Sequence, residues 1–485
     1  MATGRCGAGQ ALAKKRIGEE GVSRMTKLLN RMTDEVQAVG RIAFGAVDRR
    51  GKIVAAGADG GHLRYTVHGG PGEAFDDAAL RTLTAEFVRF ALDSDLSCLA
   101  LEVEGVDALS PQASEAAAEG ALAGACAFTK YRTQGAARAK LASFALIGGD
   151  EAGLERGRVV GTALIFARSL ANEPPNVLTP EAFVSVARRL AGRATLSCEF
   201  YDEWEISGFG MNGLMAVGRG SANPPRLIHM VYRPGGLPVR RVAVVGKGVT
   251  FDSGGLCVKG PDEMQCMKYD KSGACVMMGV LQAAAELGLP IEVHGIAALV
   301  ENMPDGAAYR PGDIVRTMSG KTVEVQDTDC EGRLVLADVL TFASRLEPDA
   351  LIDVATLTGS VKDALGKYTA ALVCDDDGLS AALLRAAGRA GERFHRFTMD
   401  DERLREGLRG TFADLRPYSP DGGGPIAGGM FLREFVKPGV PWAHIDIGAT
   451  GWYDREFGVY ARGASAYSLT TVVEYLRDVA AAEAR

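Results

Sequence analysis

Three acidic residues lie close together in the segment 324–340, EVQDTDCEGRLVLADVL, where Asp327, Asp329 and Glu331 are spaced two residues apart. The residues before them read as the end of a strand, and the residues after them read as an apolar helix. Carboxylates packed this closely repel one another, so most must protonate or move apart unless a cation neutralises them. The segment therefore predicts a counter-charge in the folded chain.

Further charged residues follow the predicted strand RVAVVG (241–246): the basic Lys247 and Lys259 and the acidic Asp252 and Asp270. Taken singly, each could be a solvated loop charge, because most charged residues face water. Together with the two carboxylates at 329 and 331, they would bring four acidic groups to the strand ends of one sheet. Two divalent metals about 3.5–4 Å apart would neutralise such a set, and this pairing suits hydrolysis by a shared water.

Other site motifs fit less well. In the segment GKGVTFDSGG, Phe251 stands where the dinucleotide-binding pattern GxGxxG needs glycine, and the same segment lacks the GK[ST] of a phosphate-binding loop. Neither Ser253 nor Ser272 lies in the GxSxG of a serine hydrolase. None of the six histidines forms HExxH. We expect His444, in WAHIDIG, to be a core histidine or one that orients a ligand, rather than a ligand itself.

The chain as a whole is typical of a globular protein that works away from membranes and nucleic acid. Its 485 residues predict two or three domains, and its formal net charge of −7 disfavours a polyanionic partner. No apolar run reaches the roughly 18 residues that would span a bilayer. The nine cysteines form no CxxC pair, which favours a cytoplasmic chain with reduced thiols. Residues 1–24 read as a flexible extension, with a basic organelle-targeting segment as the alternative.

Strand-like and helix-like segments alternate along the chain, which predicts an α/β fold. We expect a smaller N-terminal α/β domain over 25–165, a linker over 166–180 that contains ANEPPNVLTP, and a larger catalytic domain over 181–485. In the first domain, strands are predicted at 41–47, 98–105 and 141–148, and helices at 73–92 and 114–128. In the second, mostly apolar strands are predicted at 241–246, 291–300, 350–357, 369–375 and 442–448, with helices at 273–288, 332–346 and 467–483. Such strands predict a mainly parallel sheet flanked by helices, which carries its site at the strands' carboxyl ends.

Five segments resemble, in order, the signature blocks of the leucyl aminopeptidase (cytosol aminopeptidase) family. They are VGKGVTFDSGG, MKYD, ENMPDGAAYRPGDIV, DTDCEGRLVLAD and DVATLTG. The resemblance covers residues 165 to 480 and extends more loosely into the first domain. DTDCEGRL is close to the family's highly specific NTDAEGRL.

The resemblance implies the ligands of a two-metal centre: Lys247, Asp252, Asp270, Asp329 and Glu331. Asp252 and Glu331 match bridging carboxylates. Lys247 and Asp270 would serve the tighter metal site, and Asp329 the more exchangeable one, partly through its backbone carbonyl. The implied ions are Zn²⁺, Mn²⁺ or both, with Mg²⁺ or Co²⁺ as alternatives. A lysine ligand must be a neutral amine, which adjacent divalent cations favour.

The resemblance also implies roles around the metals. Lys259 matches the lysine that polarises the scissile carbonyl, and Arg333 matches the arginine that holds a bicarbonate acting as general base. Pocket walls for the first side chain match Met267, Thr356, Gly359 and Gly448. The implied enzyme is a metal-dependent homohexamer that removes leucine and other apolar N-terminal residues from peptides, by attack of a metal-bridged water. The alternatives are a catalytically silent scaffold and a nucleic-acid binder.

Three residues depart from the family pattern: Asp327 replaces Asn, Lys271 replaces an uncharged residue, and Cys330 replaces Ala. Asp327 and Lys271 are either a pair of opposite charges that offset each other near the metals or two unrelated surface charges. If the loop is extended at Cys330, this side chain should face away from the metals as a small packed residue, with an accessory thiol ligand as the alternative.

Overall fold

The computed structural model describes residues 27–29, 31–33, 35–43, 52–69, 76–134, 138–192 and 195–482. Its N-terminal part contains a six-stranded sheet in the order β1-β6-β5-β2-β4-β3, parallel except for the antiparallel pair of β3 and β4. The strands are β1 (Lys27–Leu29), β2 (Ala38–Ala43), β3 (Ile53–Asp59), β4 (His62–His68), β5 (Cys98–Val103) and β6 (Ser143–Leu146).

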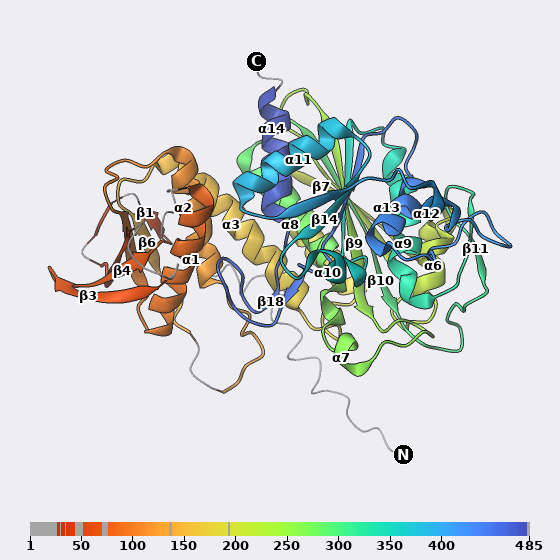
Figure 1. Cartoon of the computed structure of the whole chain (residues 1–485), viewed down its shortest axis with the longest axis horizontal. Coiled ribbons are helices and arrows are strands. Elements are labelled where there is room, and N and C mark those ends of the chain that lie inside the picture. Colours follow the sequence, from red (N-terminus) through yellow and green to blue (C-terminus); the bar gives the residue numbers. More distant parts are fainter. Residues whose placement is uncertain are drawn as a thin grey trace.

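Three helices belong to this part: α1 (Asp77–Asp93) precedes β5, α2 (Pro111–Ala125) precedes β6, and α3 (Glu151–Asn172) follows β6. Each begins at a side chain that accepts a backbone N–H left free in the first turn, namely Asp76, Ser110 and Asp150. α3 contacts both α2 and α8 of the catalytic part, and it lies between the two sheets (Figure 1). The helix therefore links the two halves of the molecule.

The catalytic part is built on an eight-stranded sheet in the order β15-β14-β16-β13-β9-β10-β8-β7. Its centre is parallel, whereas β14 with β16, β8 with β10, and β7 with β8 pair antiparallel. The strands are β7 (Leu196–Tyr201), β8 (Arg226–Tyr232), β9 (Arg241–Asp252), β10 (Glu292–Asn302), β13 (Ala350–Ala355), β14 (Ala370–Cys374), β15 (Phe394–Phe397) and β16 (Trp442–Asp446).

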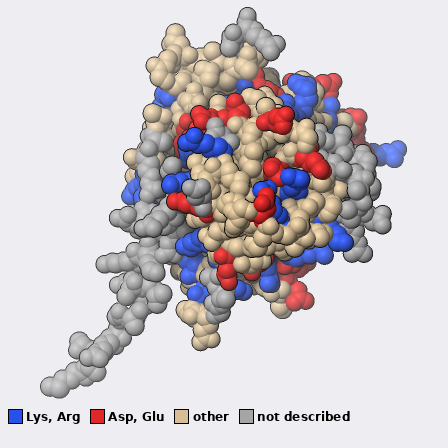
Figure 2. Space-filling view, turned by 90° about the vertical axis from the view of Figure 1, so that its left-hand side faces the viewer, with Lys and Arg blue, Asp and Glu red and all other residues tan. Residues whose placement is uncertain are grey.

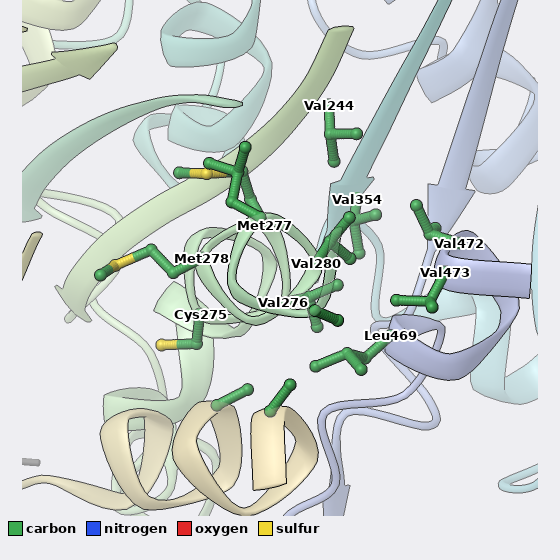
Figure 3. Packing of buried hydrophobic residues seen from close by; sticks show 14 of the residues in the cluster. Val244, Cys275, Val276, Met277, Met278, Val280, Val354, Leu469, Val472 and Val473 are labelled. Carbon is green, nitrogen blue, oxygen red and sulfur yellow. The ribbon is translucent and has the colours of Figure 1, made fainter. Parts of the chain in front are cut away.

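Helices cover both faces of this sheet and form a separate apolar core on each. One face is covered by α3, α4 (Pro180–Ala191), α8 (Ser272–Leu287), α11 (Asp377–Ala390) and α14 (Leu469–Ala482). The other face is covered by α5 (Glu203–Gly208), α6 (Asn212–Gly218), α9 (Glu331–Ser344) and α13 (Gly424–Arg433). Figure 3 shows α8 at the centre of the first core, beside the strand residues Val244 and Val354 and the α14 residues Leu469, Val472 and Val473.

Short elements complete the catalytic part and surround the carboxyl ends of its strands. They are β11 (Ile314–Arg316), β12 (Thr322–Glu324), β17 (Trp452–Tyr453), β18 (Gly463–Ala464), α7 (Pro261–Met264), α10 (Ser360–Leu365), α12 (Glu402–Glu406) and the 3₁₀ turns η1 (Met267–Lys271) and η2 (Thr328–Cys330).

The predicted α/β fold class is confirmed, including the smaller first sheet and the larger, mainly parallel second sheet. The five apolar runs predicted as strands are β9, β10, β13, β14 and β16, and all residues of β10, β13, β14 and β16 are buried. The sequence reasoning gave no bounds for α3, α11 and α13, and it missed the strands β1, β3, β4, β7, β8 and β15. The extension over 1–24 lies outside the described residues, and the domain bounds stay a prediction.

Figure 2 shows acidic and basic side chains interspersed on the face that carries the N-terminal sheet. Within the described ranges, no helix has the length and apolar character to cross a bilayer.

Candidate metal centre

The residues predicted as metal ligands meet where β9, β10 and β13 end. Asp252 is the last residue of β9, and Lys247 lies earlier on the same strand. Asp270 lies in η1, just before α8, while Asp329 lies in η2 and Glu331 begins α9. Because the carboxyl ends of parallel strands share one edge of a sheet, residues up to 84 positions apart in the sequence come together here.

Two lysines divide the four carboxylates into two groups. Lys247 Nζ lies 2.9 Å from Asp270 Oδ2 and 2.7 Å from Glu331 Oε1. Lys259 Nζ lies 2.9 Å from Asp252 Oδ2 and 2.5 Å from Asp329 Oδ1. In this arrangement the two ammonium groups supply part of the counter-charge that the clustered carboxylates need.

Neutral donors orient the two most deeply held aspartates. Asn302, at the end of β10, donates through Nδ2 to Asp252 Oδ1 at 2.9 Å, and the Gly254 backbone N–H donates to the same oxygen at 2.9 Å. The Thr356 hydroxyl donates to Asp270 Oδ1 at 2.6 Å. In each aspartate the second oxygen, Oδ2, is thereby left facing a lysine.

Burial and mutual repulsion shift the proton affinities of the cluster. Burial, reinforced by the Asp252 charge, raises the pKa of Glu331 to about 8, although Lys247 opposes the shift. Burial likewise raises the pKa of Asp270 to about 6, again against the effect of Lys247. Burial lowers the pKa of the Lys247 ammonium, but Asp270 and Glu331 outweigh burial, so that this pKa lies well above its ordinary value. The two lysines of the cluster therefore do not supply enough positive charge to neutralise its four carboxylates.

The donor set fits divalent cations. Asp252, Asp329 and Glu331 each offer an oxygen, and these three atoms lie within 4.8 Å of one another. Asp270 Oδ2 and Asp329 Oδ1 are buried and lie close to a lysine, yet neither accepts a well-oriented hydrogen bond. Oxygen ligands with free lone pairs suit hard divalent ions. A neutral Lys247 amine would add a nitrogen donor once cations neutralise its carboxylate partners.

Arg333 and the predicted pocket residues lie around this cluster. Arg333, on α9, is buried and donates through Nη1 to the Pro417 carbonyl. Met267 begins η1, and Tyr269 follows it two residues later. The Tyr269 hydroxyl donates to the Gly448 carbonyl at 3.3 Å. A Cβ on Gly448 would lie 2.4 Å from the Thr358 carbonyl, so only glycine fits there without a shift. A Cβ on Gly359 would meet no atom within 4 Å, which leaves open space at this position.

The two charged departures have separate partners. Lys271 is completely buried, and its ammonium donates to the carbonyls of Glu173, at 3.0 Å, and Lys268. Asp327 Oδ1 instead accepts the backbone N–H of Asp329 at 2.9 Å, a bond that the family's usual asparagine could also accept. The two side chains therefore do not pair, and Lys271 is not a surface charge. Burial lowers the pKa of Lys271 to about 8.

The loop is not extended at Cys330, because Thr328–Cys330 form the 3₁₀ turn η2. The argument from alternating side chains therefore does not apply. Burial raises the pKa of the Cys330 thiol to about 11, which disfavours the thiolate that a metal would bind. A small packed residue remains the better interpretation.

Sequence reasoning missed two residues that organise the site. Asn302 holds both Asp252 and the Thr328 carbonyl, the latter at 2.9 Å. Asp446, at the end of β16, accepts the backbone N–H groups of Leu357 and Gly448 and the Thr358 hydroxyl. Both are polar residues at the ends of predicted strands, so the rule that located the carboxylates could have found them.

His444 lies inside the sheet as a core histidine. Its Nδ1 lies 2.6 Å from Asp353 Oδ1, on the neighbouring strand, and its side chain has no exposed surface. Burial lowers the pKa of His444, but Asp353 outweighs burial and raises it overall.

With this geometry established, comparison with known proteins identifies the family. A model of the cytosol aminopeptidase family, catalytic domain, matches residues 165–473. The chain belongs to the cytosol aminopeptidase family. The resemblance seen in the five sequence segments is thereby confirmed.

Individual relatives of the family cover most of the chain. It is 41% identical over 416 residues to a probable cytosol aminopeptidase of Aquifex aeolicus (strain VF5), covering 86% of this chain and 84% of the relative. A probable cytosol aminopeptidase of Microcystis aeruginosa is 36% identical over 454 residues, 92% of this chain and 90% of the relative.

Two solved structures have the same fold as this chain. The bottromycin maturation enzyme BotP in complex with Mn superposes with a TM-score of 0.85 at 37% identity, over 92% of this chain and 100% of that one. A mutant of tomato leucine aminopeptidase superposes with a TM-score of 0.84 at 27% identity, over 93% and 96%. As a cytosol aminopeptidase, the chain is a peptidase that depends on divalent metal and acts on peptides.

Proposed function

We propose that this aminopeptidase releases leucine and other apolar residues from the free N-termini of peptides, using two divalent ions per subunit. The observation that carries the proposal is the cluster of four carboxylates and two lysines at the end of β9. Three of its carboxylate oxygens already lie within 4.8 Å of one another, close enough to share ions.

The ligand roles follow from the contacts of the cluster. Lys247, Asp252, Asp270, Asp329 and Glu331 would hold the two ions, with Zn²⁺ and Mn²⁺ as the leading candidates and Mg²⁺ or Co²⁺ as alternatives. Bound ions would activate water as a nucleophile at neutral pH and bind the free α-amine of the substrate.

Lys259 and Arg333 would act beside the ions. If cations were held by Asp252 and Asp329, the ammonium of Lys259 would lose these two partners and could face the scissile carbonyl. A fixed cation placed where negative charge develops stabilises the tetrahedral intermediate. Arg333, buried on α9, would hold a bicarbonate as general base, as the resemblance implies.

The preference for apolar first residues rests on the walls near η1. Met267, Thr356, Gly359 and Gly448 would line the pocket, and the open space at Gly359 leaves room for a branched aliphatic side chain. A cytoplasmic location and a homohexamer remain part of the proposal, and light scattering of the purified chain would test the assembly.

The central experiment compares leucyl-p-nitroanilide with its N-acetylated form, after chelation and stepwise return of each metal. We expect activity only on the unblocked substrate and only with metal. Equal rates on both substrates would refute binding of the free amine at the metal centre. Failure of every metal to restore activity would favour the catalytically silent scaffold instead. A panel of aminoacyl substrates then measures the first-residue preference.

A further inference from the structure

The hairpin of β17 and β18, residues 452–464, has no role in the metal cluster, yet it lies between the two halves of the molecule (Figure 1). At its base Trp452 pairs with Ala464 and Tyr453 pairs with Gly463. The hairpin begins four residues after Gly448, so it is continuous with the segment that borders the pocket.

Two arginines of the N-terminal part hold the tip of this hairpin. Arg89, on α1, donates through Nη2 to the carbonyls of Gly458, at 2.9 Å, and Tyr460, at 3.4 Å. Arg138 makes a two-pronged pair with Glu456, with Nη1–Oε1 at 3.0 Å and Nη2–Oε2 at 2.8 Å. Only 16% of the Arg138 side chain is exposed. Such paired charge-assisted hydrogen bonds fix orientation as well as position.

The base of the hairpin contacts the pocket. The Trp452 ring lies 6.1 Å from the ring of Tyr269, whose hydroxyl donates to the Gly448 carbonyl. A Cβ on Gly451 would lie 3.1 Å from both Thr356 Cγ2 and Tyr269 Cε2. A displacement of the hairpin would therefore move groups that touch the pocket wall, because packed interiors transmit displacement.

A second set of contacts joins the N-terminal part to η1, which also contains Tyr269. Lys130 Nζ and the Tyr131 hydroxyl donate to the carboxylate of Glu173 at 2.7 Å and 2.5 Å. The backbone carbonyl of Glu173 accepts in turn from the buried Lys271 of η1. The Lys268 ammonium, also in η1, lies 5.8 Å from the Phe128 ring centre and 5.7 Å from that of Trp452.

From these contacts we propose that the N-terminal domain sets the shape of the first-residue pocket. The 452–464 hairpin is the element that determines specificity, and Arg89 and Arg138 are its positioning residues. This inference rests on the proposed aminopeptidase function. It assigns the N-terminal domain a part in substrate selection although none of its described residues belongs to the metal cluster.

The test replaces Arg138 by Met and compares KM and kcat on leucyl-p-nitroanilide and alanyl-p-nitroanilide. We expect KM for the leucyl substrate to rise by roughly tenfold while kcat stays within about twofold, as for loss of uniform binding. The alanyl substrate should change little, because its methyl group contacts less of the wall. Arg138→Lys should recover part of the effect, since lysine keeps the charge but not the two-pronged geometry.

The matched control is Arg158→Met, which removes a similar two-pronged pair, with Glu155, away from the hairpin. Glu456→Gln provides a second variant that reaches the hairpin from its own side, should Arg138→Met fail to fold. Hydrogen exchange of peptides within 448–465 gives a readout that needs no catalysis, and we expect faster exchange in the hairpin variants than in the control.

The outcomes separate this inference from the proposed function. If the unaltered chain does not hydrolyse the leucyl substrate, the proposed function fails. Hydrogen exchange would still test whether the contacts of Arg138 and Glu456 hold the hairpin in place. If Arg138→Met and Glu456→Gln match Arg158→Met in leucyl-to-alanyl selectivity and in exchange of 448–465, the inference is overturned.

Discussion

Replacement of Lys259 by Met should separate its two roles, because the lysine pairs with Asp252 and Asp329 when metal is removed and would face substrate when metal is bound. Breaking a buried ion pair costs about 3–5 kcal/mol. Asp252 keeps its bonds from Asn302 and the Gly254 N–H, and Asp329 is one-third exposed, so we expect a cost at or below the lower end of that range, about 2–3 kcal/mol. At roughly 2 °C per kcal/mol for a domain of this size, the metal-free Tm should fall by about 4–6 °C.

Binding of metal should reverse the loss of thermal stability in Lys259→Met. A divalent ion must displace the Lys259 ammonium from two carboxylates in the unaltered chain, whereas Met offers no competing charge. The rise in Tm on adding Mn²⁺ should therefore be larger in Lys259→Met than in the unaltered chain, with metal content retained. Turnover of the loaded variant should still fall by roughly 10²–10³, the usual effect of losing one oxyanion partner.

The assay is thermal melting with chelator and with Mn²⁺, alongside metal analysis and turnover of leucyl-p-nitroanilide. Lys437→Met is the control, because Lys437 forms an exposed pair with Glu347, and such pairs contribute little. A smaller metal-induced rise in Tm for Lys259→Met, or loss of its metal, would refute the reasoning.

Three further predictions concern the cluster. Glu331→Ala and Asp329→Ala should each lower metal occupancy and abolish turnover while the chain stays folded, and full occupancy in Glu331→Ala by metal analysis would contradict its assignment as a ligand. Burial raises the pKa of Glu331 from 4.5 to about 8 and that of Asp270 to about 6, so the neutral forms are favoured in the metal-free fold. The resulting stabilisation is complete below the unfolded pKa and is lost as pH rises through the folded one, so the metal-free Tm should fall between about pH 4.5 and 8, and a flat profile would count against it. Lys271→Met should destabilise the chain by about 1–3 kcal/mol, because it strands two buried carbonyls, while Asp327→Asn should be nearly neutral. Their double variant should be additive in urea unfolding, and a measurable coupling energy would show that the charges do interact.

Much of the fold could be read from the sequence because its central strands are buried on both faces. β10, β13 and β16 appear as short apolar runs, and the helices between them begin and end at recognisable signals. The strands β3, β4, β7 and β15 are partly exposed, whereas β8 is buried but carries Arg226 and His229 among its apolar residues. Their mixed composition gave no run to detect, so their pairing depends on contacts with neighbours distant in sequence.

The candidate site divides in the same way. Its charged residues could be listed from the sequence because acidic side chains after apolar strands are unusual, and family motifs name them. Their grouping into Lys247 with Asp270 and Glu331, and Lys259 with Asp252 and Asp329, could not. Which side chains meet depends on the order of strands in the sheet, and strand order is a long-range property.

The sequence by itself determined the chemistry of this protein: the number and type of charged groups, the strands that carry them and the family to which they belong. The tertiary structure decided what each group touches. Lys271 lies next to a predicted ligand in the sequence, but burial turns it toward the Glu173 carbonyl and away from Asp327. Arg138 lies more than 300 residues before Glu456, yet the fold joins them in one ion pair. The sequence gives the charged residues, but the packing of sheets and helices decides which of them meet, because a charged group can pair only with partners that packing brings within reach.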